Sequence, residues 1–418
     1  YPNDIRGVSI DNETEKVKLT LTNCTVDFTD ASASDWAYAV NVTGGNEHNV
    51  TVNVGTYEGA NAINVWGNGH TININGTVLT SLYKANDSYH GCCVRLEGSG
   101  SKLDITYTTF NGEHAVAVSE ATAGANTVNA PLEEGNTAGN IDNTKVYVAK
   151  NDNVYYHSVT EAIAEAQSGA TIKLLAKNID EYVNQECNKS ITILGAAEWM
   201  EGKVTTLTGG MYLGIDNSQC DPNTIVVKGI TFEGKGLMIA SQENVTVENN
   251  IFNNITDDRA IAVIGKDIKA VAKNNTITNA AEIGIELRNM AEAAITNIVI
   301  KGTGHNSVQA TAVNADANVT ITGNTFENWG TATNTQGQLE GRAVRVSGGA
   351  NVVVNNNKMI NANAPESFVK ITKVNGQTAQ EIDVDKNYWN GNNPLALFET
   401  DGTNDPVSYI KGYYSDAD

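Results

Sequence analysis

The sequence places two carboxylates side by side at Asp257 and Asp258, in the segment Thr256-Asp257-Asp258-Arg259. Glycoside hydrolysis uses two carboxyl groups about 5 to 9.5 Å apart, so a double aspartate before a predicted strand is a candidate for acid–base catalysis. A turn followed by a solvated charge pair between Asp258 and Arg259 explains the same residues without catalysis. Asp257 and Asp258 are therefore only weak catalytic candidates.

Glu286 and Arg345 suit a different reaction, the elimination that a polysaccharide lyase performs. A lyase needs a base that removes the proton next to a carboxylate, and a cation that neutralises that carboxylate. The chain repeats, and two repeats separate Glu286 from Arg345, which corresponds to about 10 Å at the spacing of paired strands. No cluster of acids is expected around them, so no metal site is predicted.

A third group of residues suits binding: Trp66, Tyr83, Tyr89, Arg95 and Trp329. Aromatic rings offer a flat apolar face that stacks on sugar rings, and they carry polar edges. Tyr83 and Tyr89 lie in a long polar loop, and Trp329 opens another, so both loops are expected to overhang one face. The alternative is that these aromatic side chains cover the exposed edges of strands. His70 and His90 each stand alone and are predicted to be ordinary turn residues.

A repeat of short alternating strands must position these side chains. It is clearest in the segments 245–252, 319–326, 352–359 and 382–389, each with Asn at the sixth place and an apolar residue at the eighth. Its starts are Ile225, Val245, Ala270, Ile295, Val319, Val352 and Ile382, and in the first half Leu19, Val50, Thr71 and Leu103, with Val26, Tyr57, Val78 and Phe110 at the eighth place. Steps of about 20 to 30 residues with strand periodicity predict a solenoid whose coils stack on one another.

The asparagine at the sixth place has a physical role, because an inward Asn at a tight turn can bond backbone groups and other Asn side chains in the stack. These residues are Asn250, Asn275, Asn324, Asn357 and Asn387. With this ladder the sequence resembles the right-handed parallel β-helix proteins of the pectate-lyase-like superfamily. Residues 385–391 are also similar to the Asn-Tyr-Trp-Gly motif that closes bacterial surface β-helix repeats, with Asn390 inserted before Gly391.

The resemblance, which covers roughly residues 5–130 and 185–395, implies an all-β right-handed parallel β-helix. In relatives the catalytic groups lie on the outward face of the first strand of each coil. Here the expected outward residues are Asn41, Asn64, Arg95, Ala117, Met238, Ala262, Glu286, Ala312, Arg345 and Lys370. Three of these ten are alanine and one is an acid, and the motifs that accompany the double Asp of polygalacturonase-type hydrolases are absent. The superfamily includes lyases, hydrolases, adhesins and stalks, so the fold alone does not decide the function.

The middle of the chain breaks the repeat and predicts two tandem β-helical segments, 1–143 and 144–418. Residues 119–143 lack an apolar stripe and are interpreted as a linker. A hairpin is predicted around residues 151–153. A short α-helix at about 158–168 follows, opened by Ser158 and Glu161 as a capping box and expected to cap the second segment.

Composition limits the partners. The 418 residues contain 27 Lys and Arg against 48 Asp and Glu, a formal net charge of −21, which disfavours binding to nucleic acid. No run of about 18 apolar residues predicts a transmembrane segment. Since Tyr1 is not a start methionine, the chain is expected to follow a removed signal or to be an excised region. The expected location is extracellular or at the cell surface. A Cys187–Cys220 disulfide stays open, no cofactor is predicted, and Ca²⁺ stays open as a ligand of the acidic surface.

The prediction from sequence is therefore a secreted or cell-surface, bacterial-type β-helix module without catalytic activity, which binds polysaccharide or a cell-surface glycan or serves as an adhesin or stalk. One alternative is a polysaccharide lyase or glycoside hydrolase acting on an acidic polysaccharide. The other is a purely structural repeat of a larger surface protein.

Overall fold

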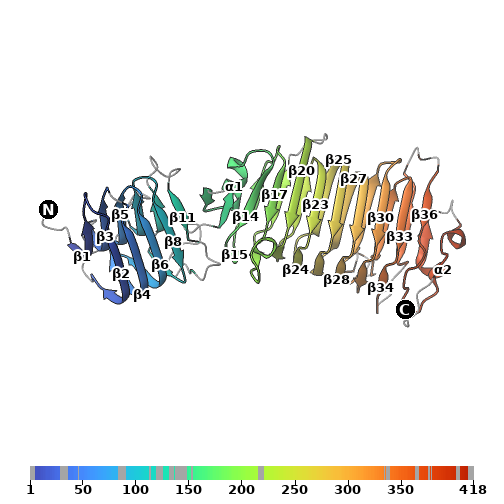
Figure 1. The fold of residues 1–418 in the computed structure, drawn as a ribbon. Helices are drawn as coiled ribbons and strands as arrows, with labels where there is room; N and C mark the ends of the chain where they lie inside the picture. The colour runs from blue at the N-terminus through green and yellow to red at the C-terminus, as the bar shows by residue number, and fades with distance from the viewer. Residues whose placement is uncertain are drawn as a thin grey trace. The chain divides into compact units, whose positions relative to one another are not determined.

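The computed structural model describes residues 5–28, 36–45, 47–82, 91–112, 114–118, 126–130, 136, 148–151, 154–214, 221–333, 335, 339–362, 367–374, 377, 379–401 and 405–412. The fold is nearly all β, and its long sheets consist of parallel strands (Figure 1). Two units are distinguished: residues 1–162 with 175–177, and residues 163–174 with 178–418. They are called unit 1 and unit 2. The predicted parallel β-helix is confirmed.

Unit 1 is built from two parallel sheets whose strands alternate along the chain. The first sheet contains β1 (Ile5–Asp11), β3 (Ala37–Gly44), β5 (Asn61–Gly67), β7 (Cys92–Glu97) and β10 (His114–Val118). The second contains β2 (Lys18–Val26), β4 (Asn49–Gly59), β6 (Thr71–Ser81), β8 (Lys102–Thr106) and β11 (Thr127–Asn129), with β9 (Thr109–Asn111) paired to β6. Since each strand of one sheet is followed by a strand of the other, successive coils stack and bury one side of each strand.

The register of unit 1 follows the predicted repeat with one correction. Leu19, Val50, Ile72 and Leu103 are paired in turn, and so are Val26, Tyr57, Leu79 and Phe110. The prediction of Thr71 and Val78 at these places was wrong by one residue. Adjacent Val78 and Leu79 are both apolar, so the sequence does not say which one points inward, and a shift by one moves a strand's side chains to the opposite face.

Unit 2 has three faces, each formed by parallel strands. Its first face contains β16 (Val183–Gln185), β19 (Met211–Gly214), β22 (Leu237–Ala240), β25 (Arg259–Lys273), β27 (Ile283–Thr296), β29 (Val308–Val313), β32 (Val344–Gly348), β35 (Val369–Thr372) and β37 (Phe398–Thr400). Its second face contains β14 (Ala170–Leu174), β17 (Ile191–Leu194), β20 (Asp221–Lys228), β23 (Gln242–Glu248), the far halves of β25 and β27, β30 (Asn318–Thr322), β33 (Asn351–Asn355) and β36 (Glu381–Asp383). Its third face contains β15 (Asn178–Ile179), β18 (Thr205–Leu207), β21 (Ile230–Glu233), β24 (Ile251–Ile255), β26 (Thr276–Ala280), β28 (Val299–Thr303), β31 (Thr325–Glu327) and β34 (Lys358–Ile360).

The repeat starts of unit 2 stack as predicted except at one coil. Ile225, Val245, Ala270, Ala293, Val319, Val352 and Ile382 are paired in turn. Ile295, predicted at the fourth place, is instead paired with Ala272 and Ile321, two residues further along the same side. The coil lacks the marker asparagine, because the buried Ile298 occupies the sixth place counted from Ala293.

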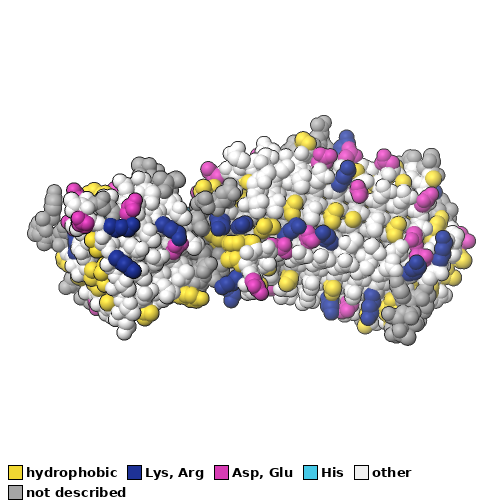
Figure 2. Space-filling model, in the orientation of Figure 1, with side chains coloured by type: hydrophobic (Ala, Val, Ile, Leu, Met, Phe, Trp, Pro, Cys, Tyr) yellow, Lys and Arg dark blue, Asp and Glu magenta, His cyan; other side chains and the backbone are white. Residues whose placement is uncertain are grey.

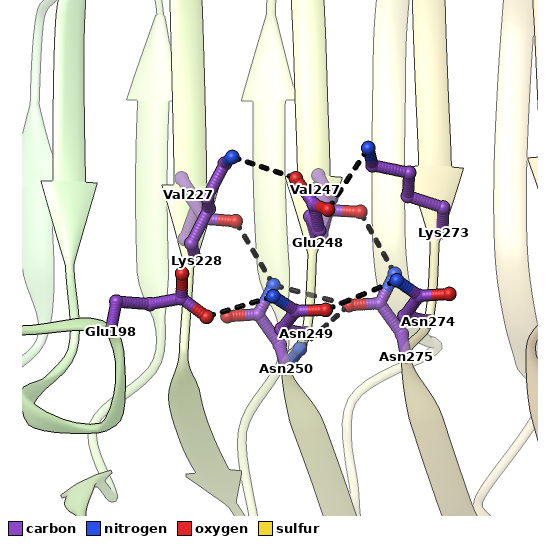
Figure 3. Close-up of polar contacts among 10 residues, drawn as sticks. All are labelled: Glu198, Val227, Lys228, Val247, Glu248, Asn249, Asn250, Lys273, Asn274 and Asn275. Atoms are coloured by element: carbon purple, nitrogen blue, oxygen red, sulfur yellow. Dashed lines mark hydrogen bonds and ion pairs between the residues drawn. The ribbon is translucent and has the colours of Figure 1, made fainter. Parts of the chain in front are cut away.

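The asparagine ladder is confirmed. Asn250 Nδ2 donates to the Val227 carbonyl at 3.0 Å and to Asn275 Oδ1 at 3.1 Å, and Asn275 Nδ2 donates to the Val247 carbonyl at 2.9 Å (Figure 3). Asn324, Asn357 and Asn387 form the same links further along the solenoid, and all five side chains are buried. Each buried amide therefore satisfies backbone groups that the turn leaves without sheet partners. Ile298 interrupts this ladder between Asn275 and Asn324.

The segment between the repeats contains the predicted hairpin and helix. β12 (Ala149–Asn151) pairs with β13 (Val154–Tyr156) in antiparallel fashion, and α1 (Val159–Glu165) follows. Ser158 Oγ accepts a hydrogen bond from the Glu161 amide at 2.9 Å, as the capping pattern predicts. The helix ends at Glu165, earlier than predicted; its role as a cap and the boundary at residue 143 stay predictions.

Short helical segments complete the elements: α2 (Pro394–Leu397), η5 (Ala196–Glu198) and η6 (Pro406–Ser408). Within the described residues, no helix has the length and apolar character that a membrane crossing demands. Cys92 and Cys93 are buried. Cys220 lies outside the described residues, so the Cys187–Cys220 disulfide stays open.

Candidate functional site

The outward side of the first sheet of unit 1 carries a row of polar residues. Asn41, Asn64, Arg95 and Ala117 occupy paired positions on β3, β5, β7 and β10, as predicted. A second outward row lies two residues further along and contains Thr43, Trp66 and Glu97. Because side chains two apart on a strand share a face, the two rows cover one continuous surface.

Hydrogen bonds hold the first row in place. Asn41 Nδ2 donates to Ser9 Oγ at 3.1 Å, and Asn64 Nδ2 donates to Asn41 Oδ1 at 2.8 Å. Asn64 is buried, and its Oδ1 has no hydrogen-bond partner among the residues that the structure describes. The Arg95 guanidinium donates to Glu97 Oε2 at 2.8 Å. Fixed amides and a paired charge therefore form a preorganised polar floor.

A hollow of about 680 Å³ lies over this floor and is called the unit 1 hollow. It is lined by Arg6, Asp11, Glu13, Trp36, Tyr38, Asn41, Thr43, Gly44, Gly45, Asn64, Trp66, Gly67, Arg95 and Glu97. Trp66 is 59% exposed and Trp36 is 49% exposed, whereas Tyr38 is buried with the Arg6 guanidinium 6.0 Å from its ring centroid. Exposed rings beside fixed polar groups are typical of sites that bind small polar ligands such as sugars.

The structure brings together only part of the predicted binding group. Trp66 and Arg95 both line the unit 1 hollow, whereas Tyr83 and Tyr89 lie outside the described residues. The prediction that Trp329 is exposed was wrong: it is fully buried and packs edge-on against Phe368, with ring centroids 4.6 Å apart. Its neighbours Asn328 and Gly330 suggest an exposed loop, but burying the large apolar ring of Trp329 is energetically favourable.

The sequence does not single out Trp36, Tyr38 or Arg6. Arg6 and Tyr38 are paired across β1 and β3, but Tyr38 lies three residues before Asn41, so simple alternation would have placed it on the inward side. Trp36 directly precedes β3, where no periodic signal marks it.

The outward row of unit 2 needs one correction. Met238, Ala262, Glu286, Gln309, Arg345, Lys370 and Glu399 are paired in turn. Gln309 stands where Ala312 was predicted. Ala312 has a positive φ of 49°, and the register of β29 shifts between Ala310 and Val313, so simple alternation fails at this residue.

Glu286 is fully buried although it belongs to this row. Its carboxylate forms ion pairs with Arg259 and with Arg288, the latter at 2.7 Å, and accepts a hydrogen bond from Gln309 Nε2 at 3.3 Å. Arg345 lies two coils away, as predicted, and Gln309 stands between the two. A buried carboxylate with two guanidinium partners holds strands together and presents no free base to a substrate.

Asp257 and Asp258 border a second hollow, of about 370 Å³, on the first face of unit 2. Asp257 pairs with Lys235 at 2.7 Å and accepts from the Gly236 amide at 3.2 Å, and Asp258 pairs with Arg259 at 3.0 Å. Arg259 thus contacts both Asp258 and Glu286. Each of these carboxylates is thus engaged in an ion pair within the protein.

Charges on the visible face of unit 2 lie in small groups of both signs among uncharged side chains (Figure 2). An ion-paired group on the second face, formed by Lys228, Glu248 and Lys273, spans three successive strands, with N–O distances of 2.7 and 2.9 Å (Figure 3). The hydrogen bond from Lys228 is the main cause that lowers the pKa of Glu248; burial opposes it and Lys273 adds to it. Among the described residues, no three His, Cys, Asp or Glu side chains are grouped so that they could hold a metal ion.

Residues 213–388 match the family model of the right-handed β-helix region. The match covers coils of unit 2 from β20 to β36. No curated protein matches the chain.

Proposed function

We propose that this chain, whose residues 213–388 belong to the right-handed β-helix family, is a secreted or cell-surface module that binds glycans without cleaving them, and that the unit 1 hollow is its binding site. The observation that carries the proposal is Trp66, an exposed ring held on a rigid strand beside the fixed amides of Asn41 and Asn64. A solenoid positions such groups firmly, because each strand is bonded to the coils on both sides.

The charges of the hollow favour a neutral glycan. Arg6 and Arg95 stand among Asp11, Glu13 and Glu97, and Arg95 is paired with Glu97. A polyanionic ligand would meet these three acids in a chain of net charge −21, and repulsion between its negative charges and those of the acids would cost affinity. Sugar hydroxyl groups, in contrast, can both donate to carboxylates and amides and accept from arginine.

The enzyme alternative rests on Asp258, which borders the second hollow, and on the buried Glu286, which shares Arg259 with it. It would require one of these carboxyl groups to act as an acid or base on a substrate. Glu286 is buried under two arginines, and Asp258 is paired with Arg259, so the arrangement supports structure better than catalysis.

A glycan array followed by calorimetry tests the proposal. Trp66→Ala should weaken binding of the best neutral glycan about two- to tenfold, because a stacking ring is worth about 0.5–1.5 kcal/mol. The matched control is Tyr107→Ala, which removes a side chain that is 68% exposed on unit 1 but outside the hollow, and it should leave binding unchanged. Equal losses in both variants, or no glycan bound by the wild type, would contradict the proposal. New reducing or unsaturated ends, abolished by Asp258→Asn, would instead support the enzyme.

A further inference from the structure

Two histidines that the proposed function does not use lie beneath the rim of the unit 1 hollow. His48 directly precedes β4 and His70 directly precedes β6, and both side chains are fully buried. Their rings stack with centroids 5.1 Å apart and planes 12° from parallel. The prediction that His70 is an isolated turn residue was therefore wrong, and His90 lies outside the described residues.

The pair belongs to a ladder that links successive coils. The Val17 amide donates to His48 Nδ1 at 3.1 Å, and the His48 amide donates to His70 Nδ1 at 3.1 Å. The ladder continues with other side chains: the His70 amide donates to Ser101 Oγ at 3.0 Å, and the Ser101 amide donates to Asn126 Oδ1 at 3.0 Å. At each step a side chain accepts the backbone N–H of the preceding coil.

These bonds determine the protonation state of both rings. A ring nitrogen that accepts a hydrogen bond carries no proton, so Nδ1 of each histidine is bare and the proton of the neutral ring is on Nε2. For His48 this agrees with the neighbours of Nε2, the carbonyl oxygens of Asn12 at 3.1 Å and Thr43 at 3.2 Å. A second proton would have to bind Nδ1, where it would face a backbone N–H and break the link between coils.

The same rings support the rim of the hollow. Thr43, which contacts His48 through its carbonyl, lines the hollow, and so does Gly67, whose backbone packs so closely on His70 that a Cβ there would lie 2.6 Å from Nε2. The Gly44 and Trp66 carbonyl groups also act on the pKa of His70, although its buried Nε2 forms no hydrogen bond with any described residue.

We propose that His48 and His70 form an acid-sensitive latch: neutral, they hold the rim of the unit 1 hollow in place, and protonation of either ring releases the rim and weakens ligand binding. The binding part of this inference rests on the proposed function. The structural part, loss of the inter-coil links in acid, stands on the geometry alone and is measured without a ligand.

The direction of the pH effect follows from burial. Burial first, and then the neighbouring His48, lower the pKa of His70 below 6.5, against the opposing effect of the Gly44 and Trp66 carbonyl groups. The unfolded chain therefore takes up a proton at higher pH than the folded chain. The stability that the neutral ring supplies is complete above pH 6.5 and is lost as the pH falls from 6.5 towards and through the lowered pKa.

Among the described residues, the charged side chains on the neighbouring turns and strands are paired with each other or line the hollow. On the adjoining turns, Lys16 and Glu47 pair with each other at 3.5 Å and are largely exposed. The acids on the neighbouring strands, Asp11, Glu13 and Glu97, line the hollow, and the coils beyond His70 contribute the uncharged Ser101 and Asn126 to the ladder.

Hydrogen exchange of the full chain at pH 7.5 and pH 5, corrected for intrinsic exchange rates, tests the latch. In the wild type, protection of the Val17 and His48 amides should fall about tenfold or more at pH 5. If opening lets one histidine bind a proton, the equilibrium constant for opening rises about tenfold for each pH unit below the histidine's pKa in the open state. The double variant His48→Asn and His70→Asn should keep its protection, because Asn accepts the same N–H without titrating, as Asn126 does in this ladder. The control His305→Asn, in unit 2, should behave as the wild type does.

Binding supplies the second readout. If the wild type binds a glycan, its affinity should fall about tenfold from pH 7.5 to pH 5, and the double Asn variant should lose much less. If no glycan binds at any pH, the proposed function fails while the exchange experiment still decides the latch. Equal protection of the wild-type amides at both pH values would overturn the latch. So would nitrogen NMR that finds a proton on Nδ1 of either ring at pH 7.5, a measurement that remains valid should the double variant not fold.

Discussion

Asn64 donates its side-chain amide to Asn41 across two adjacent coils at 2.8 Å, while its own Oδ1 is buried with no hydrogen-bond partner among the described residues. A buried acceptor left unsatisfied costs about 1–3 kcal/mol. Such an atom at the floor of a hollow is stabilised when a hydroxyl donor reaches it. The unsatisfied amide and the exposed Trp66 therefore point to the same surface of unit 1.

Asn64→Ala should weaken glycan binding about five- to tenfold, since one hydrogen bond of about 1 kcal/mol is lost and the Asn41 amide loses its neighbour. Calorimetric titration of the best array ligand measures the change. Asn73→Ala, on the second sheet of unit 1, is the control and should bind as the wild type does. Unchanged affinity in Asn64→Ala would remove this residue from the site.

Asn357→Ala should destabilise unit 2 by about 1–3 kcal/mol, because it leaves the Asn324 amide and the Ile321 carbonyl without their buried partner. Chemical denaturation followed by the fluorescence of the buried Trp329 and Trp389 measures the loss. Asn351→Ala removes an exposed asparagine whose side chain donates to the exposed Asn318, and it should cost less than about 0.5 kcal/mol. Equal costs would mean that the ladder contributes no more than a surface amide.

The two tryptophans selected from the sequence should behave in opposite ways. Trp329→Ala should cost about 3–5 kcal/mol of folding free energy, as expected for a large ring removed from a packed core, and should not alter binding at unit 1. Trp66→Ala should leave the denaturation midpoint nearly unchanged and reduce binding. A stable Trp329→Ala variant that lost glycan affinity would restore Trp329 as a ligand-binding residue.

The faces of the strands could be predicted from the sequence, because alternation with a period of two says which residues point inward. The register could not be predicted where the turn asparagine was missing or where two adjacent apolar residues could each point inward. Val78 and Leu79 are both apolar, so either could point inward. Ile298 stands where the other coils have the turn asparagine. Ala312 adopts a left-handed backbone that stops the alternation. Each of these errors therefore concerns the register of a single coil, within a fold that was predicted correctly.

The histidine ladder shows what the corrected register reveals. His48, His70, Ser101 and Asn126 each lie two residues before an inward residue of the stack: Val50, Ile72, Leu103 and Val128. With Thr71 taken as the repeat start, His70 falls out of line with the others and looks isolated. The ion pairs of Arg259 with Asp258 and Glu286 depend on how long side chains extend between neighbouring coils, and no periodicity encodes this.

Glu248→Gln tests the electrostatics of the second face of unit 2. The folded-state pKa of Glu248 is lowered, so the stability that its charge supplies is present above pH 4.5 and is lost as the pH falls below that value. Gln keeps the shape but cannot pair with Lys228 and Lys273, which are partly exposed, so the variant should be less stable at pH 7 by about 1 kcal/mol or less. The difference from the wild type should shrink as the pH is lowered from 5 to 3 and also when salt is added at pH 7. A difference that stayed constant with pH would show that packing, and not the charge of Glu248, accounts for the loss.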